Sequence, residues 1–353
     1  MMEVHKHSNR YLELDALRGI AALLVVFFHF TRHRPEADFG FKLFATGVDL
    51  FFMISGFVIF MSFAKITKGI EFVINRFCRL YPTYWASVSF SFLIICLTIL
   101  FRGLLPEGSD LLRYLGNLTM FQYYMPVKNL EGAYWTMIIE MLFYILMFLL
   151  YKLRLFKWIN LIGVCLSIVS LTLVFGFGTS EFAKLVLAYF PLLKFIPLFF
   201  AGIVFYKLIA DERSGNYFYL LILFYFLCQL ALFESTGRSN FGITQYQYIL
   251  MLLIYFGVFV LFVNQKLSSI VSKLTLFLGK ISFALYLIHE HLSHDVLLPL
   301  LVDKWQINFW LASVFIVLPA VISVATIITY GVEIPIGKSL KIKLRKLAGI
   351  ADK

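Results

Sequence analysis

Apolar residues run along this chain in stretches that are too long for a soluble core. A transmembrane helix needs about 20 predominantly apolar residues, and the polar segments between the apolar stretches are mostly short. The apolar stretches predict ten membrane-spanning helices, at residues 12–31, 43–64, 82–101, 133–151, 157–176, 185–208, 216–233, 246–263, 275–293 and 307–332. We therefore predict an all-α polytopic membrane protein whose residues 1–353 form a single integral-membrane domain.

The Lys and Arg residues of the loops predict the orientation of the bundle. If the N-terminus is cytoplasmic, the cytoplasmic segments hold 20 Lys and Arg residues and the opposite loops hold 9, with Arg18 and Lys194 left out because they lie inside spans. Cytoplasmic loops normally carry this excess, so both termini are predicted to be cytoplasmic. The basic tail 333–353 is predicted to lie on anionic lipid as an interfacial helix. No signal-peptide cleavage site follows the first apolar stretch.

Composition excludes a soluble protein and changes the meaning of the charge. Of the 353 residues, 61% are hydrophobic and 14% are charged, whereas soluble domains have about a quarter charged residues. The net charge of +11 is therefore interpreted as the loop excess of a membrane protein, and no nucleic-acid partner is predicted. The four cysteines are scattered and have neither metal-ligand nor disulfide spacing.

Ionisable residues inside membrane spans are costly, which makes those of the first two spans candidates for function. Arg18 and His29 are eleven residues apart, about three helical turns, so they share one face about 16 Å apart, with Asp15 near the same stripe. Because the first two spans form a hairpin, Asp49 should lie at the depth of His29 and could hydrogen-bond to it. A carboxylate on one imidazole nitrogen raises the basicity of the other, as a general base requires. The alternative is an anchoring arginine and a packing histidine.

The second and third spans add small and basic residues. Gly56 follows Asp49 by two helical turns and would allow another helix to approach closely, and Ser55 beside it could be a polar contact. Arg76 and Arg79 share one face of a short helix, and Pro82 is predicted to begin the next helix. Paired guanidinium groups suit phosphate. The alternative is ordinary anchoring at the cytoplasmic surface.

The fourth span carries a carboxylate among apolar residues. Trp135, Glu140 and Tyr144 fall on one broad face of the predicted helix. A carboxylate in this position needs a partner or a proton. Glu140 could orient Arg18, stabilise a cation or take part in proton transfer.

The ninth span ends in a group of three histidines and one glutamate at residues 289–294. The zinc-peptidase pattern requires a second histidine four residues after His289, where Ser293 stands. No metal site is predicted, and His289 is interpreted as a polar group that faces the bundle.

Taken together and in this order, these motifs resemble the membrane-bound acyltransferase-3 family from the first span to the last. Two features depart from the family pattern: no proline follows Tyr144 closely, and Glu290-His291 occupies a pair that usually ends in proline. The motifs that carry the resemblance are Arg18-x10-His29, Gly47-Val48-Asp49-Leu50-Phe51-Phe52-Met53-Ile54-Ser55-Gly56-Phe57, Arg76-x-x-Arg79-Leu80-Tyr81-Pro82, Trp135-Thr136 with Glu140 and Phe143-Tyr144, and Ile281-Ser282-Phe283-Ala284-Leu285-Tyr286-Leu287-Ile288-His289.

The resemblance implies an O-acyltransferase of the bacterial inner membrane with acyl-CoA, by default acetyl-CoA, as co-substrate and no permanently bound cofactor. It implies that His29 is the catalytic base and Asp49 its orienting carboxylate, and that Arg18, Arg76 and Arg79 bind the donor. Either direct transfer or a transient acyl-His29 would use these residues. The remaining polar residues of the predicted site are Asp15, Ser55, Tyr81, Trp135, Glu140, Tyr144 and His289.

The implied acceptor is a hydroxyl of a surface or secreted carbohydrate such as O-antigen or exopolysaccharide, or of a lipid-linked glycan. The acyl group could instead pass to a separate periplasmic protein. The competing interpretation is a proton-coupled transporter of a small anionic or sugar substrate, with His29, Asp49 and Glu140 as a proton relay. The absence of an inverted repeat and the presence of Arg76-x-x-Arg79 favour the enzyme.

Overall fold

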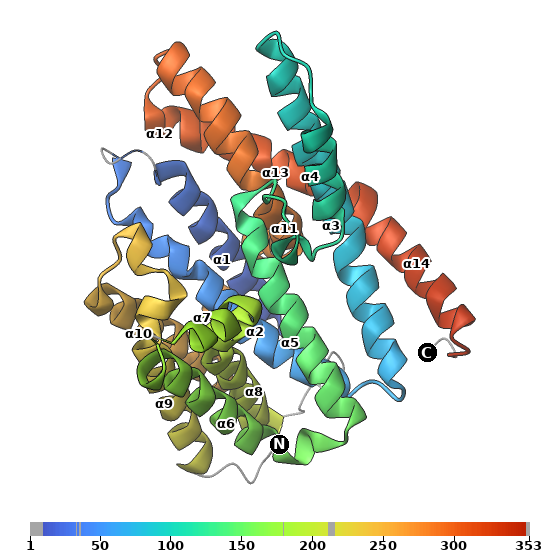
Figure 1. Cartoon of the computed structure of the whole chain (residues 1–353), viewed down its shortest axis with the longest axis vertical. Helices are drawn as coiled ribbons and strands as arrows, with labels where there is room; N and C mark the ends of the chain where they lie inside the picture. Colours follow the sequence, from blue (N-terminus) through green and yellow to red (C-terminus); the bar gives the residue numbers. More distant parts are fainter. Residues whose placement is uncertain (1–9, 33, 35–36, 179, 211–215, 351–353) are drawn as a thin grey trace.

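The computed structural model describes residues 10–32, 34, 37–178, 180–210 and 216–350, and within these ranges it is helical without any strand (Figure 1). Residues 1–9 of the predicted cytoplasmic N-terminus and the last three residues of the basic tail lie outside the described part. Within that part, seven helical segments are long and apolar enough to cross a membrane: Leu12–Thr31, Phe41–Phe63, Gly69–Phe101, Gly132–Lys152, Leu155–Gly176, Gln245–Val263 and Phe309–Leu347. The all-helical membrane class is confirmed, whereas the count of ten spans and the side of the termini stay predictions.

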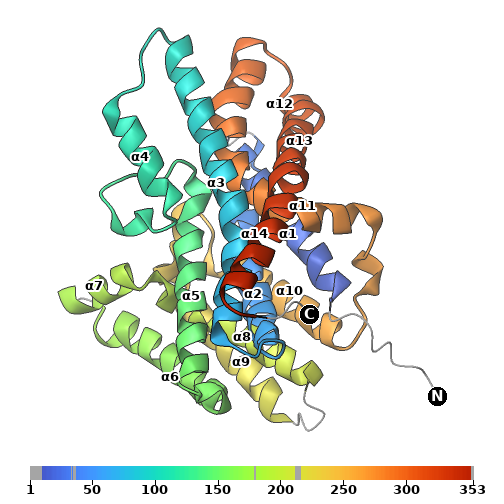
Figure 2. The same ribbon diagram turned by 90° about the vertical axis from the view of Figure 1, so that its right-hand side faces the viewer.

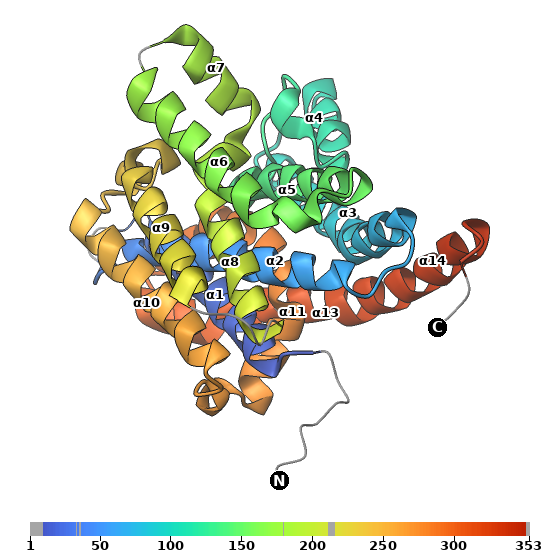
Figure 3. The ribbon, with the colours of Figure 1, turned by 90° about the horizontal axis from the view of Figure 1, so that it is seen from below.

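Two pairs of helices in close contact form the centre of the bundle (Figure 3). They are α1 (Leu12–Thr31) with α11 (Lys273–Glu290), and α2 (Gly47–Phe63) with α8 (Ile196–Ala210). Both contacts depend on glycine: a Cβ at Gly279 would overlap the carbonyl oxygen of Asp15, and a Cβ at Gly56 would overlap that of Phe199. The predicted close approach at Gly56 is confirmed.

The third helix differs from its prediction. One continuous helix, α3 (Gly69–Phe101), contains both the arginine pair and Pro82, which was predicted to begin a new helix. Pro82 lacks the N–H that would bond to the carbonyl of Cys78. Gly337 of a later helix lies against that carbonyl, and a Cβ there would be 2.8 Å from the oxygen. Contact with a neighbouring helix is one way in which a membrane helix tolerates an internal proline.

The remaining helices surround this centre (Figures 1 and 2). The span predicted at 185–208 is broken, because the backbone of Phe190 leaves the helical region before Pro191. The break separates α7 (Glu181–Tyr189) from α8. The surrounding helices are α4 (Gly108–Leu118), α5 (Trp135–Lys152), α6 (Ile159–Leu171), α7 (Glu181–Tyr189), α9 (Asn216–Ala231) and α10 (Gln245–Val263).

The C-terminal part is more continuous than predicted. After α11 the chain continues through π-helical turns to Lys304, and then forms α12 (Phe309–Ala312), α13 (Leu318–Ile328) and α14 (Ile334–Leu347), joined by further π-helical turns. The basic tail therefore extends the last span, and it packs along α3 instead of lying on lipid alone. Buried Arg345 of α14 reaches Glu71 of α3 at 3.4 Å.

Candidate active site

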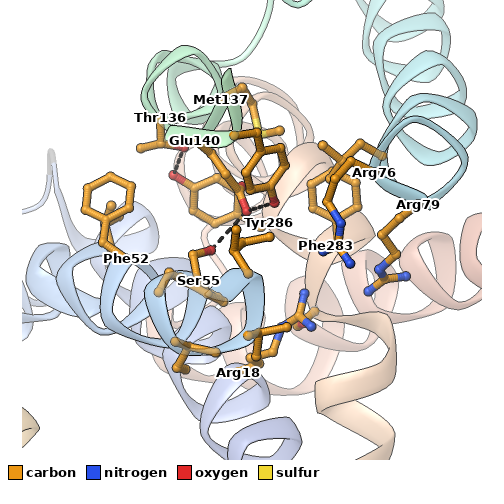
Figure 4. Close-up of a pocket in the computed structure, with 18 residues that line it drawn as sticks. Arg18, Phe52, Ser55, Arg76, Arg79, Thr136, Met137, Glu140, Phe283 and Tyr286 are labelled. Carbon is orange, nitrogen blue, oxygen red and sulfur yellow. Dashed lines mark hydrogen bonds between the residues drawn. The ribbon is translucent and has the colours of Figure 1, made fainter. Parts of the chain in front are cut away.

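A cavity lies between α1, α2, α3, α5 and α11 (Figure 4). It has about 820 Å³ of empty space, including the part open at its mouth. Six of the predicted site residues line it: Arg18, Ser55, Arg76, Arg79, Glu140 and Tyr144. These six residues come from four of the predicted motifs, which the cavity brings together.

The cavity has an excess of positive charge. The guanidinium groups of Arg18, Arg76 and Arg79 point toward one another (Figure 4). Arg79 forms an ion pair with Glu333, from the turns before α14. Among the described residues, Arg18 and Arg76 have neither an ion pair nor a hydrogen bond, and the Nε of Arg76 is buried without an acceptor. A group of cations with so few counter-charges is suited to a polyanionic ligand.

The carboxylate of Glu140 lies on the opposite wall from α1. The hydroxyl of Ser55 donates to Glu140 Oε1 at 3.0 Å, and the hydroxyl of Tyr144 donates to the same oxygen. The sequence left three roles open for Glu140, one of which was to orient Arg18. In the structure Glu140 makes no direct contact with Arg18, because its carboxylate is bonded to the two hydroxyl groups.

His29 lies outside the cavity lining, and its partners come from α11. Its Nδ1 is 3.3 Å from Glu290 Oε1, and its ring is 4.9 Å from that of His289. Arg32 also reaches the Glu290 carboxylate, at 3.5 Å. A Cβ at Gly132 would overlap this carboxylate, so the 3-10 turn that precedes α5 lies in close contact with it. Glu290 thus contacts one imidazole nitrogen and leaves Nε2 for chemistry.

The predicted hydrogen bond between His29 and Asp49 is wrong. Asp49 Oδ1 instead accepts a hydrogen bond of 2.6 Å from Arg238 Nη2, and both side chains are at most 2% exposed. A 3-10 segment at 41–46 comes before α2, so Gly47 lies against Ala21 and Val25 of α1. Asp49 therefore lies about one to two helical turns closer than His29 to the beginning of α1.

The other predicted residues are dispersed. His289 is buried beside His29, a neighbour that the sequence did not predict, and its Nδ1 is 2.9 Å from the carbonyl of Tyr286. Asp15 forms an ion pair with Arg10. Tyr81 donates to the carbonyl of Thr119 at 3.1 Å, and the guanidinium of Arg238 lies 5.7 Å from the ring centroid of Trp135. None of these four lines the cavity.

Three functional candidates were missed or misread from the sequence. Glu290 was a departure from the family pattern, and its place next to two histidines was the available signal. Arg238 entered the sequence analysis only as one of the loop cations, and no motif around it indicates a buried ion pair. Tyr286 lines the cavity, where it shares a hydrogen bond of 2.9 Å with Thr136. His289 follows it by one helical turn.

Another buried carboxyl group, that of Glu131, lies close to the end of α11 and outside the apolar spans. Glu131 is buried, accepts hydrogen bonds from Ser91 Oγ at 2.6 Å and from the backbone N–H of His291 at 2.8 Å, and burial raises its pKa to about 8. His291 and His294 both contact Asp295 at 2.7 Å and hold its pKa well below the usual range. These two histidines are thus engaged with a carboxylate.

The helical bundle and its apolar spans define a polytopic membrane protein with an arginine-rich cavity. A family model described as an acyltransferase domain, Acyl_transf_3, matches residues 11–330, and the chain therefore belongs to the acyltransferase-3 family.

Two relatives agree with this assignment. "Protein 2 in picA locus" of Rhizobium radiobacter is 36% identical over 115 residues, which cover 30% of this chain and 56% of that protein. The chain thus matches little more than half the length of that relative. "Putative acetyltransferase ORF330" of Acidianus two-tailed virus is 24% identical over 313 residues, 80% of this chain and 85% of that protein. No solved structure matches the chain.

Proposed function

We propose that this membrane acyltransferase moves an acyl group, by default acetyl, from cytoplasmic acyl-CoA to a hydroxyl of a surface or secreted carbohydrate. O-antigen, exopolysaccharide and lipid-linked glycans are the acceptor classes of choice, and the membrane is the bacterial inner membrane. The family gives acyl transfer, and the relative named as an acetyltransferase supports acetyl. Acyl transfer follows from the family, whereas coenzyme A as the donor and a carbohydrate as the acceptor are proposed here.

The excess of guanidinium groups in the cavity is the observation that carries the donor assignment. Coenzyme A has several phosphate groups, and arginine binds phosphate through paired N–H donors. Arg18 and Arg76 form no ion pair among the described residues, so a phosphate would supply the missing anions. A carrier for a neutral sugar has no need of this charge.

His29 and Glu290 would perform the chemistry. His29 Nε2 accepts the proton of the acceptor hydroxyl while Glu290 holds Nδ1, and the hydroxyl oxygen forms a bond to the thioester carbonyl carbon. The tetrahedral adduct then loses the coenzyme A thiolate, which takes the proton back from the imidazolium. This sequence balances without any further reactant. Glu290 replaces Asp49 as the orienting carboxylate in the proposal.

The experiment measures alkali-labile acyl groups on envelope and secreted glycans of a deletion strain. The strain carries wild type, His29→Ala or His294→Ala at equal expression. His294 is the matched control because it lies beyond α11 and contacts Asp295 rather than His29. Wild type and His294→Ala are expected to restore the esters, and His29→Ala is not.

A binding measurement tests the donor separately. Coenzyme A should raise the thermal stability of the purified wild type and of His29→Ala, but much less that of Arg18→Gln, because ligand binding to the folded state alone stabilises it. Restored esters in His29→Ala would remove His29 from the mechanism. If coenzyme A stabilised none of these proteins, the donor assignment would fail.

A further inference from the structure

An apolar groove lies next to the donor cavity, between α3 and α5. It encloses about 640 Å³ of empty space, including the part open at its surface. Val73 on one lip and Ile145 on the other are 42% and 41% exposed. The groove is lined by Phe72, Val73, Arg76, Phe77, Leu80, Tyr81, Met141, Tyr144, Ile145 and Phe148. In an apolar span such an opening faces hydrocarbon.

Arg76 connects the groove to the donor cavity. Arg76, Leu80 and Tyr144 line both spaces, so no other layer of side chains separates them. The guanidinium carbon of Arg76 is 5.7 Å from the ring centroid of Phe72 and 6.0 Å from that of Tyr144, and its Nε is buried without a hydrogen-bond acceptor. The groove thus combines aromatic and aliphatic walls with one cation that has no anionic partner among the described residues.

We propose that this groove binds an anionic phospholipid, with an acyl chain between α3 and α5 and the phosphate on Arg76. The apolar walls match the chain, and the charge of Arg76 matches the phosphate. A zwitterionic lipid carries an additional cation in its headgroup next to three arginines, so an anionic headgroup is preferred. Arg76 belongs to the predicted cytoplasmic half of α3, which places the site in the inner leaflet.

The site has a consequence for the donor, and this consequence rests on the proposed function. Arg76 cannot pair fully with a lipid phosphate and a coenzyme A phosphate at the same time. Anionic lipid therefore competes with the donor for Arg76, and the affinity for coenzyme A depends on the composition of the membrane.

The test uses the full-length protein and two matched variants of α5. Ile145→Trp fills the lip of the groove, whereas Leu149→Trp, one helical turn further along, places the same side chain on an exposed position outside the groove, at 46% exposed in the wild type. Each protein is reconstituted in phosphatidylcholine with phosphatidylglycerol and extracted with mild detergent, and the retained lipid is identified by mass spectrometry. Wild type and Leu149→Trp should retain phosphatidylglycerol above its share of the mixture, and Ile145→Trp should lose this enrichment.

The second readout is stabilisation by coenzyme A in nanodiscs of phosphatidylcholine alone or mixed with phosphatidylglycerol. Wild type should need several-fold more coenzyme A in the mixed membrane, and Ile145→Trp should need the same amount in both. Equal enrichment of phosphatidylglycerol in Ile145→Trp and Leu149→Trp would overturn the lipid site. The lipid site would also be overturned if Ile145→Trp kept its phosphatidylglycerol and lost only the binding of long-chain acyl-CoA, because the groove would then hold the acyl chain of the donor. If coenzyme A stabilises no sample, the proposed function fails, while lipid retention still decides the lipid site.

Discussion

Replacing Arg238 with methionine would leave the Asp49 carboxylate buried without its cation. The two charged atoms are 2.6 Å apart and both side chains are essentially inaccessible. At an effective dielectric constant near 20, their attraction is about 6 kcal/mol. Part of this offsets the loss of hydration, and removal of one partner from a buried pair costs about 3–5 kcal/mol. We expect Arg238→Met and Asp49→Leu each to reduce the free energy of unfolding by that amount.

The double variant Asp49→Leu/Arg238→Met removes both charges and should cost much less than either single change, because apolar replacement of a buried pair is often close to neutral. The assay is unfolding by sodium dodecyl sulfate in bicelles, with Lys128→Met as the control for loss of one exposed loop cation. If the two single losses simply added in the double variant, the charges would not be coupled. If the double variant lost as much stability as either single variant, leaving one charge unpaired would carry no penalty. Either result would refute the argument.

Three further outcomes follow from the same structure. Gly56→Ala should lower the free energy of unfolding by about 1–3 kcal/mol through overpacking, whereas Gly257→Ala on α10, where a Cβ meets nothing within 4 Å, should leave it nearly unchanged. The raised pKa of Glu131 means that its protonated form favours the folded state, so the melting temperature should fall as pH rises from about 5 through 8, and Glu131→Gln should flatten that slope. Glu290→Gln should lower kcat at least about tenfold in an acyl-transfer assay, because an orienting carboxylate holds the catalytic imidazole in the correct tautomer, while Asp49→Asn should leave kcat per folded protein unchanged. The reverse pattern would show that Asp49, and not Glu290, orients His29.

Features that depend on local sequence were predictable. Long apolar runs are sufficient to predict membrane helices, because the bilayer leaves the backbone no other partner. The role of Gly56 followed from its small size on a helix face. Pro82 misled because its usual meaning is a helix start. The helix continues because Gly337, more than 250 residues further along, lies against the carbonyl that Pro82 cannot bond.

The pairing of the buried charges was not predictable, because it depends on register and on distant segments. A helical hairpin predicts that His29 and Asp49 are neighbours only if the second helix begins directly after the loop. The 3-10 turns at 41–46 change the rise per residue and move Asp49 below His29. Arg238 reaches Asp49 from a loop 189 positions away, and a single sequence gives no signal for such a contact.

The distribution of charge explains why these polar residues form separate groups. In an apolar bundle each buried charge needs a counter-group within contact distance, because hydration is absent. His29 with Glu290 and Asp49 with Arg238 meet that requirement as pairs. The cavity does not, since only one of its three arginines, Arg79, has an ion pair, with Glu333. The other carboxylate of the cavity, Glu140, is hydrogen-bonded by two hydroxyl groups instead. Of the three groups, only the cavity keeps an excess positive charge, and that excess is tolerable where an anionic substrate or lipid regularly provides the missing charge.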